Sequence, residues 1–126
     1  MKKQIILTPD APLPIGPYNQ AIQIDNILYL SGQIPLTSKM QLIQNDLIQE
    51  VEQVMKNLEA VLKAANMNFM NVVKSTIFLD NMDNFETVNN IYGKYFKKDS
   101  APARETVAVK TLPKNVRVEI SMIAHQ

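Results

Sequence analysis

The stretch APARETVAVKTLPKNVRVEI, residues 101–120, decides how the C-terminal part of this chain is organised. Alternating apolar and polar residues over 104–109 and again over 116–123 are typical of β-strands. The segment between them, 110–115, contains Leu112-Pro113 and Asn115 and is typical of a turn. Two alternating runs joined by a few turn residues predict a β-hairpin.

Two charged residues of this stretch point to chemistry. Arg104 and Thr106 share one face of the first strand, because side chains alternate along a strand with a period of two. A hairpin register with its turn near Leu112-Pro113 places Glu119 on the same face, although sequence does not fix the register. The spacing alone favours an ordinary cross-strand pair between Arg104 and Glu119. The alternative is a small site in which a guanidinium and a carboxylate face one space.

The composition is that of an ordinary globular domain. The chain has 126 residues, of which 46% are hydrophobic and 20% charged, so we expect one domain over residues 1–126. The net charge is +1 and like charges form no block. This balance gives no electrostatic footprint for nucleic acid or for an anionic membrane, so we expect neither as a partner.

The residue types exclude several kinds of site. The chain has no cysteine, and its single histidine is His125. Disulfides, thiolate catalysis, a zinc cluster and a histidine-based triad are therefore excluded or implausible, and we expect no metal and no cofactor. The apolar run near the N-terminus is too short for a signal peptide, and no run approaches a membrane span. We therefore expect a soluble, cytoplasmic protein.

The remaining pattern predicts the order β-β-β-α-β-α-β-β. A continuous apolar stripe predicts a helix over 46–65, with Asp46 as its N-cap, and a second stripe predicts a helix over 83–98. The earlier strands are expected at 4–7, 18–24, 27–31 and 72–79. This order predicts an α+β fold with one mixed sheet and two helices packed on a single face. Several strands have apolar residues on both faces, so the uncovered sheet face is expected to pack against another subunit.

Several separated motifs resemble, in order, those of the Rid family, the reactive intermediate deaminases, also called the YjgF family. The matching motifs are Gly16-Pro-Tyr-Asn-Gln-Ala21, Leu30-Ser-Gly-Gln-Ile-Pro35, Val88-Asn89 with Tyr92 and Tyr95-Phe96, Pro102-Ala-Arg104, and Leu112-Pro113 with Val118-Glu-Ile120. The resemblance runs from about Pro14 to the C-terminus. It implies a chorismate-mutase-like fold and a homotrimer with its sites at the subunit interfaces.

The resemblance also implies an activity. Enzymes of the RidA type, the 2-iminobutanoate/2-iminopropanoate deaminases, hydrolyse reactive 2-imino acids or their enamines to 2-oxo acids and ammonia. Arg104 matches the arginine that binds the substrate carboxylate, and a guanidinium fork suits that task. Glu119 matches the glutamate that orients water and moves its proton. The other matching pocket positions are Tyr18, Ser31, Gly32, Asn89 and Thr106.

Residue types also leave other interpretations open. Considered without the resemblance, Tyr18 is typical of a packing residue, Gly32 of a turn residue, and Asn89 of a solvated surface residue. Thr106 stands where relatives often have cysteine, and Glu105 where a small residue is common; we expect Glu105 on the strand face opposite Arg104. Since fold does not fix function, the alternative function is a non-catalytic small-ligand-binding or regulatory trimer.

Overall fold

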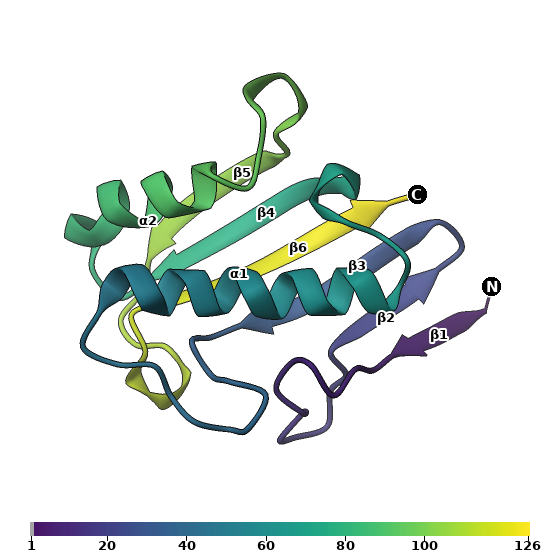
Figure 1. Cartoon of the computed structure of the whole chain (residues 1–126), viewed down its shortest axis with the longest axis horizontal. Coiled ribbons are helices and arrows are strands. Elements are labelled where there is room, and N and C mark those ends of the chain that lie inside the picture. The colour runs from purple at the N-terminus through teal and green to yellow at the C-terminus, as the bar shows by residue number, and fades with distance from the viewer. Residues whose placement is uncertain (1) are drawn as a thin grey trace.

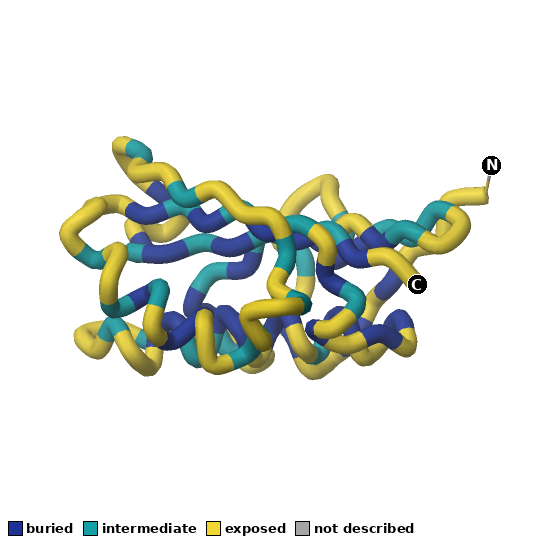
Figure 2. The backbone as a smooth tube through the Cα atoms, turned by 90° about the horizontal axis from the view of Figure 1, so that it is seen from above, coloured by how far each residue is buried: buried dark blue, intermediate teal, exposed yellow. Residues whose placement is uncertain are grey.

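The computed structural model describes residues 2–126, which fold into one mixed sheet with two α-helices on a single face (Figure 1). The strands are β1 (Lys3–Ile6), β2 (Ala21–Ile24), β3 (Ile27–Gln33), β4 (Val72–Leu79), β5 (Ala103–Ala108) and β6 (Val118–His125), and the helices are α1 (Leu47–Ala64) and α2 (Phe85–Gly93). The predicted order of elements and the α+β class are confirmed. Figure 2 shows the two layers, with the helices along one side of the sheet.

The sheet order is β1-β2-β3-β6-β4-β5, and the predicted hairpin between residues 104 and 123 is wrong. Among the described residues, β5 pairs only with β4, in parallel, whereas β6 lies between β3 and β4 and pairs antiparallel with both. The physical reason is the crossover through α2, which returns the chain to the same end of the sheet before β5 begins. The segment 109–117 then carries the chain past β4 to the centre of the sheet instead of turning back on β5.

This topology also overturns the expectation that Arg104, Thr106 and Glu119 share a sheet face. Arg104 pairs with Ser75, whose buried hydroxyl accepts a hydrogen bond from α2, so Arg104 and Thr106 lie on the helix side. Glu119 pairs with Phe78, three residues along β4 from Ser75, and therefore lies on the opposite side. Within one chain the two charged residues belong to different faces of the sheet.

The first helix forms as its sequence predicts. The Asp46 carboxylate accepts a hydrogen bond from the Gln49 backbone N–H at 3.2 Å and so caps the N-terminus. Asn66 adopts a left-handed backbone (φ 59°) just beyond the C-terminus. Most of the apolar stripe of α1 is buried against the sheet, for example at Leu58 and Leu62, whereas Ile48 at its start is exposed. The second helix is shorter than predicted, because a 3₁₀ turn, Met82–Asn84, precedes it and the chain leaves the helix after Gly93.

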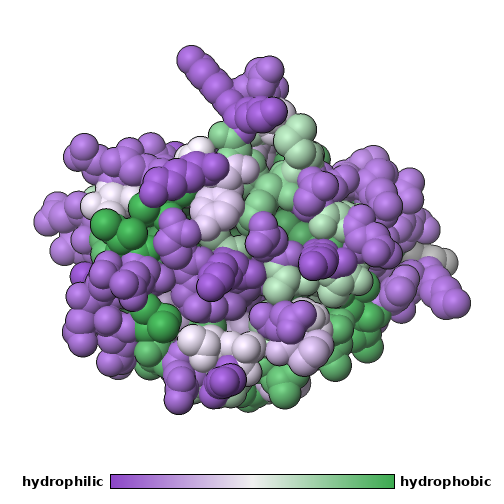
Figure 3. All heavy atoms as spheres, in the orientation of Figure 1, coloured by the Kyte–Doolittle hydropathy of each residue, from purple (hydrophilic) through white to green (hydrophobic). Residues whose placement is uncertain are grey.

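The two outer surfaces of the molecule differ in character. The side that carries the helices is mostly hydrophilic (Figure 3). The other side of the sheet is bare of helices and exposes large apolar side chains, including Ile5, Tyr29 and Val107. Within residues 2–126, neither helix is long and apolar enough to cross a membrane.

Candidate functional site

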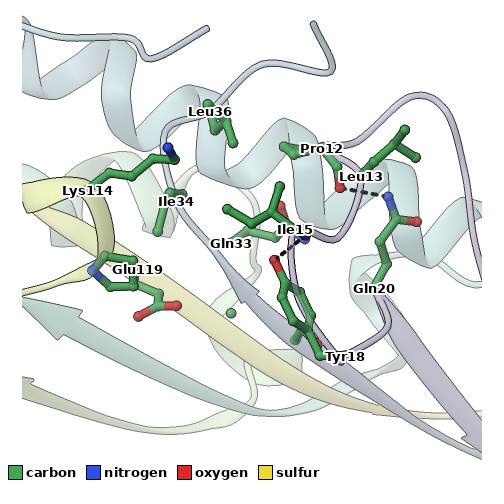
Figure 4. Close-up of a pocket in the computed structure, with 13 residues that line it drawn as sticks. Pro12, Leu13, Ile15, Tyr18, Gln20, Gln33, Ile34, Leu36, Lys114 and Glu119 are labelled. Atoms are coloured by element: carbon green, nitrogen blue, oxygen red, sulfur yellow. Dashed lines mark hydrogen bonds between the residues drawn. The ribbon is translucent and has the colours of Figure 1, made fainter. Parts of the chain in front are cut away.

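Glu119 lines a cavity of about 360 Å³ at one end of the sheet (Figure 4). Three other predicted site residues, Tyr18, Ser31 and Gly32, line the same cavity. The rest of the wall is mostly aliphatic: Pro12, Leu13, Ile15, Ile34, Leu36 and Pro113. In Figure 4 the Glu119 carboxylate and the Tyr18 ring point toward a common space. Four residues from three separate sequence motifs are thus brought together.

The Glu119 carboxylate lies directly against Gly32. A Cβ atom placed on Gly32 would approach Glu119 Cδ to 2.9 Å and Cγ to 3.0 Å, closer than side chains tolerate. Gly32 lies inside β3 and has no positive φ, so the turn expected there from the sequence is not the reason for the glycine. A bulge does occur here, since three steps along β3 from Leu30 to Gln33 face two steps along β6. The absence of a side chain at Gly32 therefore leaves the space that the Glu119 carboxylate occupies.

Burial raises the pKa of the Glu119 carboxyl above its ordinary value. The cause is desolvation, which disfavours the charged form. No basic side chain forms a salt bridge with Glu119 within residues 2–126. A carboxylate with a raised pKa, beside a cavity and free of an ion pair, is suited to accept a proton and to return it.

A proline-rich strap, defined as residues 9–17, forms the outer wall of the cavity and is fixed by a residue that sequence reasoning overlooked. Gln20 is fully buried; its Nε2 donates to the Pro12 carbonyl at 2.9 Å, and its Oε1 accepts from the Thr8 N–H at 2.7 Å. The Tyr18 hydroxyl accepts a weak hydrogen bond from the Ile15 N–H at 3.4 Å. Gln20 belongs to a quoted motif, and only its burial distinguishes it from an ordinary surface glutamine.

The remaining predicted residues form a second cluster, on the helix side of the sheet. Arg104 Nη1 donates to Asn89 Oδ1 at 2.7 Å, so Asn89 turns its amide toward the arginine and is not merely solvated. The guanidinium carbon lies 5.2 Å from the centroid of the Tyr92 ring and 5.8 Å from that of Phe85. Within residues 2–126, Arg104 forms no salt bridge, so most of its N–H donors are free.

Thr106 and Glu105, the two departures from the family pattern, lie on opposite faces as the strand period requires. Thr106 Oγ1 is buried and has no hydrogen-bond partner among the described residues. Glu105 forms a salt bridge with Lys74 at 3.0 Å and accepts a hydrogen bond from Thr76 at 2.7 Å. These contacts, the hydrogen bond foremost, lower the pKa of Glu105. Glu105 is therefore occupied on the bare face and does not compete for Arg104.

The ordinary ion pair that the sequence left open for Arg104 and Glu119 is found elsewhere. Arg117 donates from Nε to Glu50 Oε1 at 3.0 Å and from Nη2 to Oε2 at 2.5 Å, and Glu50 is almost fully buried. This bidentate pair links Arg117, the residue before β6, to Glu50 in α1. By contrast, neither Arg104 nor Glu119 has such a partner within residues 2–126.

Comparison with known proteins places the chain in a family. Residues 8–126 match the family model described as Endoribonuclease L-PSP. A crystal structure from Yersinia pestis, described as a protein of unknown function of the conserved Rid protein family, YyfA, has 47% sequence identity to the chain and a TM-score of 0.96. That match covers 99% of this chain and 100% of the other. The chain belongs to the Rid family.

Two further Rid relatives have informative names. The mouse 2-iminobutanoate/2-iminopropanoate deaminase is 47% identical over 125 residues, which cover 98% of this chain and 92% of the mouse protein. A crystal structure of TdcF from E. coli with bound serine is 34% identical, with a TM-score of 0.91 over 98% of each chain. The Rid fold expected from the sequence is therefore confirmed.

Proposed function

We propose that this Rid protein hydrolyses 2-imino acids, or the enamines in equilibrium with them, to 2-oxo acids and ammonia. The observation that carries the proposal is the pair of free charged groups: Arg104 with unused N–H donors, and Glu119 half-buried beside a cavity without an ion partner. The 47% identity to a mouse deaminase of this specificity supports it. The serine bound by TdcF supports a small ligand with a carboxylate.

In the proposed reaction Arg104 binds the substrate carboxylate with two parallel hydrogen bonds and orients the C=N carbon. Glu119 accepts a proton from a water molecule, whose oxygen attacks that carbon. The substrate nitrogen enters protonated, as an iminium, so the tetrahedral intermediate carries a hydroxyl and an amino group. Glu119 then returns the proton to the amine nitrogen. As the C–N bond breaks, the hydroxyl group gives its proton to Glu119, the C=O bond of the 2-oxo acid forms, and ammonia leaves. Water is the only co-reactant, and no metal or cofactor takes part.

We further propose that each site forms between two chains of a homotrimer. Arg104 and Glu119 lie on opposite faces of the sheet within one chain, so a single substrate cannot reach both there. The bare apolar face of the sheet, with Tyr29 45% exposed, suits a subunit interface. Arg104, Asn89 and Thr106 would come from one chain, and Glu119, Tyr18, Ser31 and Gly32 from its neighbour. The aliphatic wall around Glu119 suits a short alkyl side chain on the substrate.

The activity is tested by supplying the imine in place. A threonine dehydratase generates 2-iminobutanoate, semicarbazide traps it, and the protein should lower the trapped fraction. Glu119→Gln should reduce the rate about 10²–10⁴-fold, as loss of a positioned general base does, while affinity for 2-oxobutanoate survives. Arg104→Lys keeps the charge but loses the planar fork, so both affinity and rate should fall. A non-catalytic binding protein instead leaves trapping unchanged in every variant.

The shared site is tested by mixing two inactive variants. In a head-to-tail ring of randomly mixed Arg104→Ala and Glu119→Gln chains, about one quarter of the interfaces combine an intact arginine with an intact glutamate. Unfolding and refolding the 1:1 mixture should therefore restore about a quarter of the wild-type rate. If both residues of a site come from the same chain, the mixture stays as inactive as its components.

A further inference from the structure

The side of α2 that faces β5 holds Arg104 with three residues at helical spacing. Phe85, Asn89 and Tyr92 follow one another at intervals of four and three, so their side chains lie in a row along one face of the helix. Each of the three contacts the arginine: Asn89 through a hydrogen bond of 2.7 Å, and the two rings through their faces. We call Phe85 and Tyr92 the aromatic cradle.

The cradle is anchored at one end. Tyr92 is 5% exposed, and its hydroxyl donates to Ser75 Oγ at 2.8 Å, so the ring cannot rotate away from its place. Ser75 is fully buried in β4 and pairs with Arg104 in the neighbouring strand. The ring that supports the guanidinium and the strand that carries it are therefore fixed to the same residue. Phe85 is 37% exposed and forms the outer part of the cradle.

We propose that Phe85 and Tyr92 are positioning residues that hold the guanidinium plane of Arg104 so that its free edge is presented to the substrate carboxylate. The inference rests on the proposed function, because it concerns the arginine that binds that carboxylate. A cation over an aromatic face within about 6 Å is attracted to it, and the rings also restrict the rotamers of a long side chain. A preorganised fork loses less conformational freedom when it binds, which increases affinity.

The cradle leaves the guanidinium usable. The rings contact its faces and Asn89 occupies one edge donor, so the other N–H groups remain in the plane in which a carboxylate binds. Arg117 shows the contrasting arrangement, in which both oxygens of a buried carboxylate bind the Nε–Nη2 edge of the guanidinium. Two arginines of the same chain are thus set up for different tasks by their neighbours.

The test measures binding of 2-oxobutanoate by calorimetry and the KM and kcat of imine hydrolysis. Phe85→Leu, at a partly exposed position that tolerates change, should weaken binding about 2- to 5-fold, and Tyr92→Leu about 5- to 30-fold. Because the carboxylate contact is made in both ground and transition states, the loss should appear in KM, with kcat changed less than about 3-fold. Phe85→Tyr and Tyr92→Phe keep a ring and should restore wild-type affinity to within about 3-fold.

A structural control and a direct observation of the arginine complete the design. Tyr95→Leu removes a neighbouring aromatic ring that packs on Phe69 and does not contact Arg104, so it should lower the melting temperature without raising KM. The Nε–H resonance of Arg104, assigned by its loss in Arg104→Lys, should show a ring-current shift that disappears in Tyr92→Leu and in Phe85→Leu.

The outcomes separate the two proposals. If the leucine variants keep the wild-type KM and affinity, or if the Arg104 resonance is unshifted in the wild type, the cradle has no positioning role. If the wild type neither binds 2-oxobutanoate nor hydrolyses the imine, the proposed function fails, and the resonance alone then supports or overturns the cradle. If binding falls equally in Tyr95→Leu, the effect is one of general stability and the inference is wrong.

Discussion

Gly32→Ala is the sharpest test of the Glu119 site, because the change is one methyl group and the contact is defined. The new Cβ would lie 2.9 Å from Glu119 Cδ and 3.0 Å from Cγ. Carbon atoms pack favourably at about 3.5–4.0 Å, so the carboxylate must recede by about 0.5–1 Å. A misplacement of about 1 Å in a reacting group can cost about 10²-fold in rate. We expect imine hydrolysis to fall by that factor.

Stability should hardly change in the same variant. Alanine is preferred over glycine inside a strand by about 0.5–1 kcal/mol. Forcing the Glu119 side chain off its rotamer costs about 0.5–1.5 kcal/mol. The two effects oppose each other, so the free energy of unfolding should stay within about 1 kcal/mol of the wild type. A large loss of rate without a loss of stability is the expected signature.

The other glycines provide the control. A Cβ on Gly93, at the end of α2, meets no atom within 4 Å. Gly93→Ala should therefore stabilise the protein by about 0.5–1 kcal/mol and leave hydrolysis unchanged. The assay is the semicarbazide competition, with thermal or urea unfolding measured on the same samples. If Gly32→Ala is folded and hydrolyses imine within about 3-fold of the wild-type rate, the close approach of Gly32 and Glu119 is not what sets the catalytic geometry.

Five further outcomes are expected. The rate of hydrolysis should rise with pH along a limb whose midpoint lies above 4.5, the ordinary pKa of glutamate, and this limb should be absent in Glu119→Gln. Because burial raises the pKa of Glu119 in the folded state, the free energy of unfolding of the wild type should fall as pH rises through that pKa, and Glu119→Gln should not show this loss. The prediction is contradicted if the unfolding curves of the wild type and the variant shift equally with pH. Arg117→Ala leaves the buried Glu50 carboxylate unpaired and should cost about 3 kcal/mol, and a melting temperature equal to the wild type would show that the pair is unimportant. Tyr29→Asp places a charge on the bare sheet face and should yield smaller species in sedimentation together with a loss of activity, whereas an unchanged mass removes this face from the proposed interface. Dialysis against a chelator should leave hydrolysis unchanged, and a loss of activity that a divalent ion restores would refute a metal-free reaction.

The sequence predicts the helices and strands of this fold better than it predicts which strands pair with each other. The period of the helix 46–65 and its capping residue Asp46 predict α1 almost to the residue, because local hydrogen bonds and one buried stripe determine a helix. The strand at 72–79 is likewise found as predicted. Alternation in 104–109 and 116–123 predicts two strands but cannot say whether they pair with each other. The crossover through α2 decides that they do not.

For the candidate site, likewise, the sequence suggests residues but not their arrangement. The resemblance selects Arg104 and Glu119 as site residues, and neither forms a salt bridge within residues 2–126, but it does not show that they lie on opposite faces of the sheet. The reason for Gly32 cannot be read from the sequence either, since a glycine required by a neighbouring carboxylate looks like one required by a turn. The role of Gln20 cannot be read from the sequence, because it depends on the burial of the side chain and on its hydrogen bond to Pro12 of the strap, eight residues earlier.

The place of β6 in the sheet has a consequence for how the protein is made. β6 is the last strand in chain order, yet it lies between β3 and β4 and contributes Val118, Ile120, Met122 and Ala124 to the core. The ribosome delivers residues 118–125 after the other five strands, so the nascent chain lacks the middle of its sheet until they emerge. Glu119 is part of that same segment. The carboxylate and the fold that shapes its cavity therefore arrive in one step, and an incomplete chain has neither.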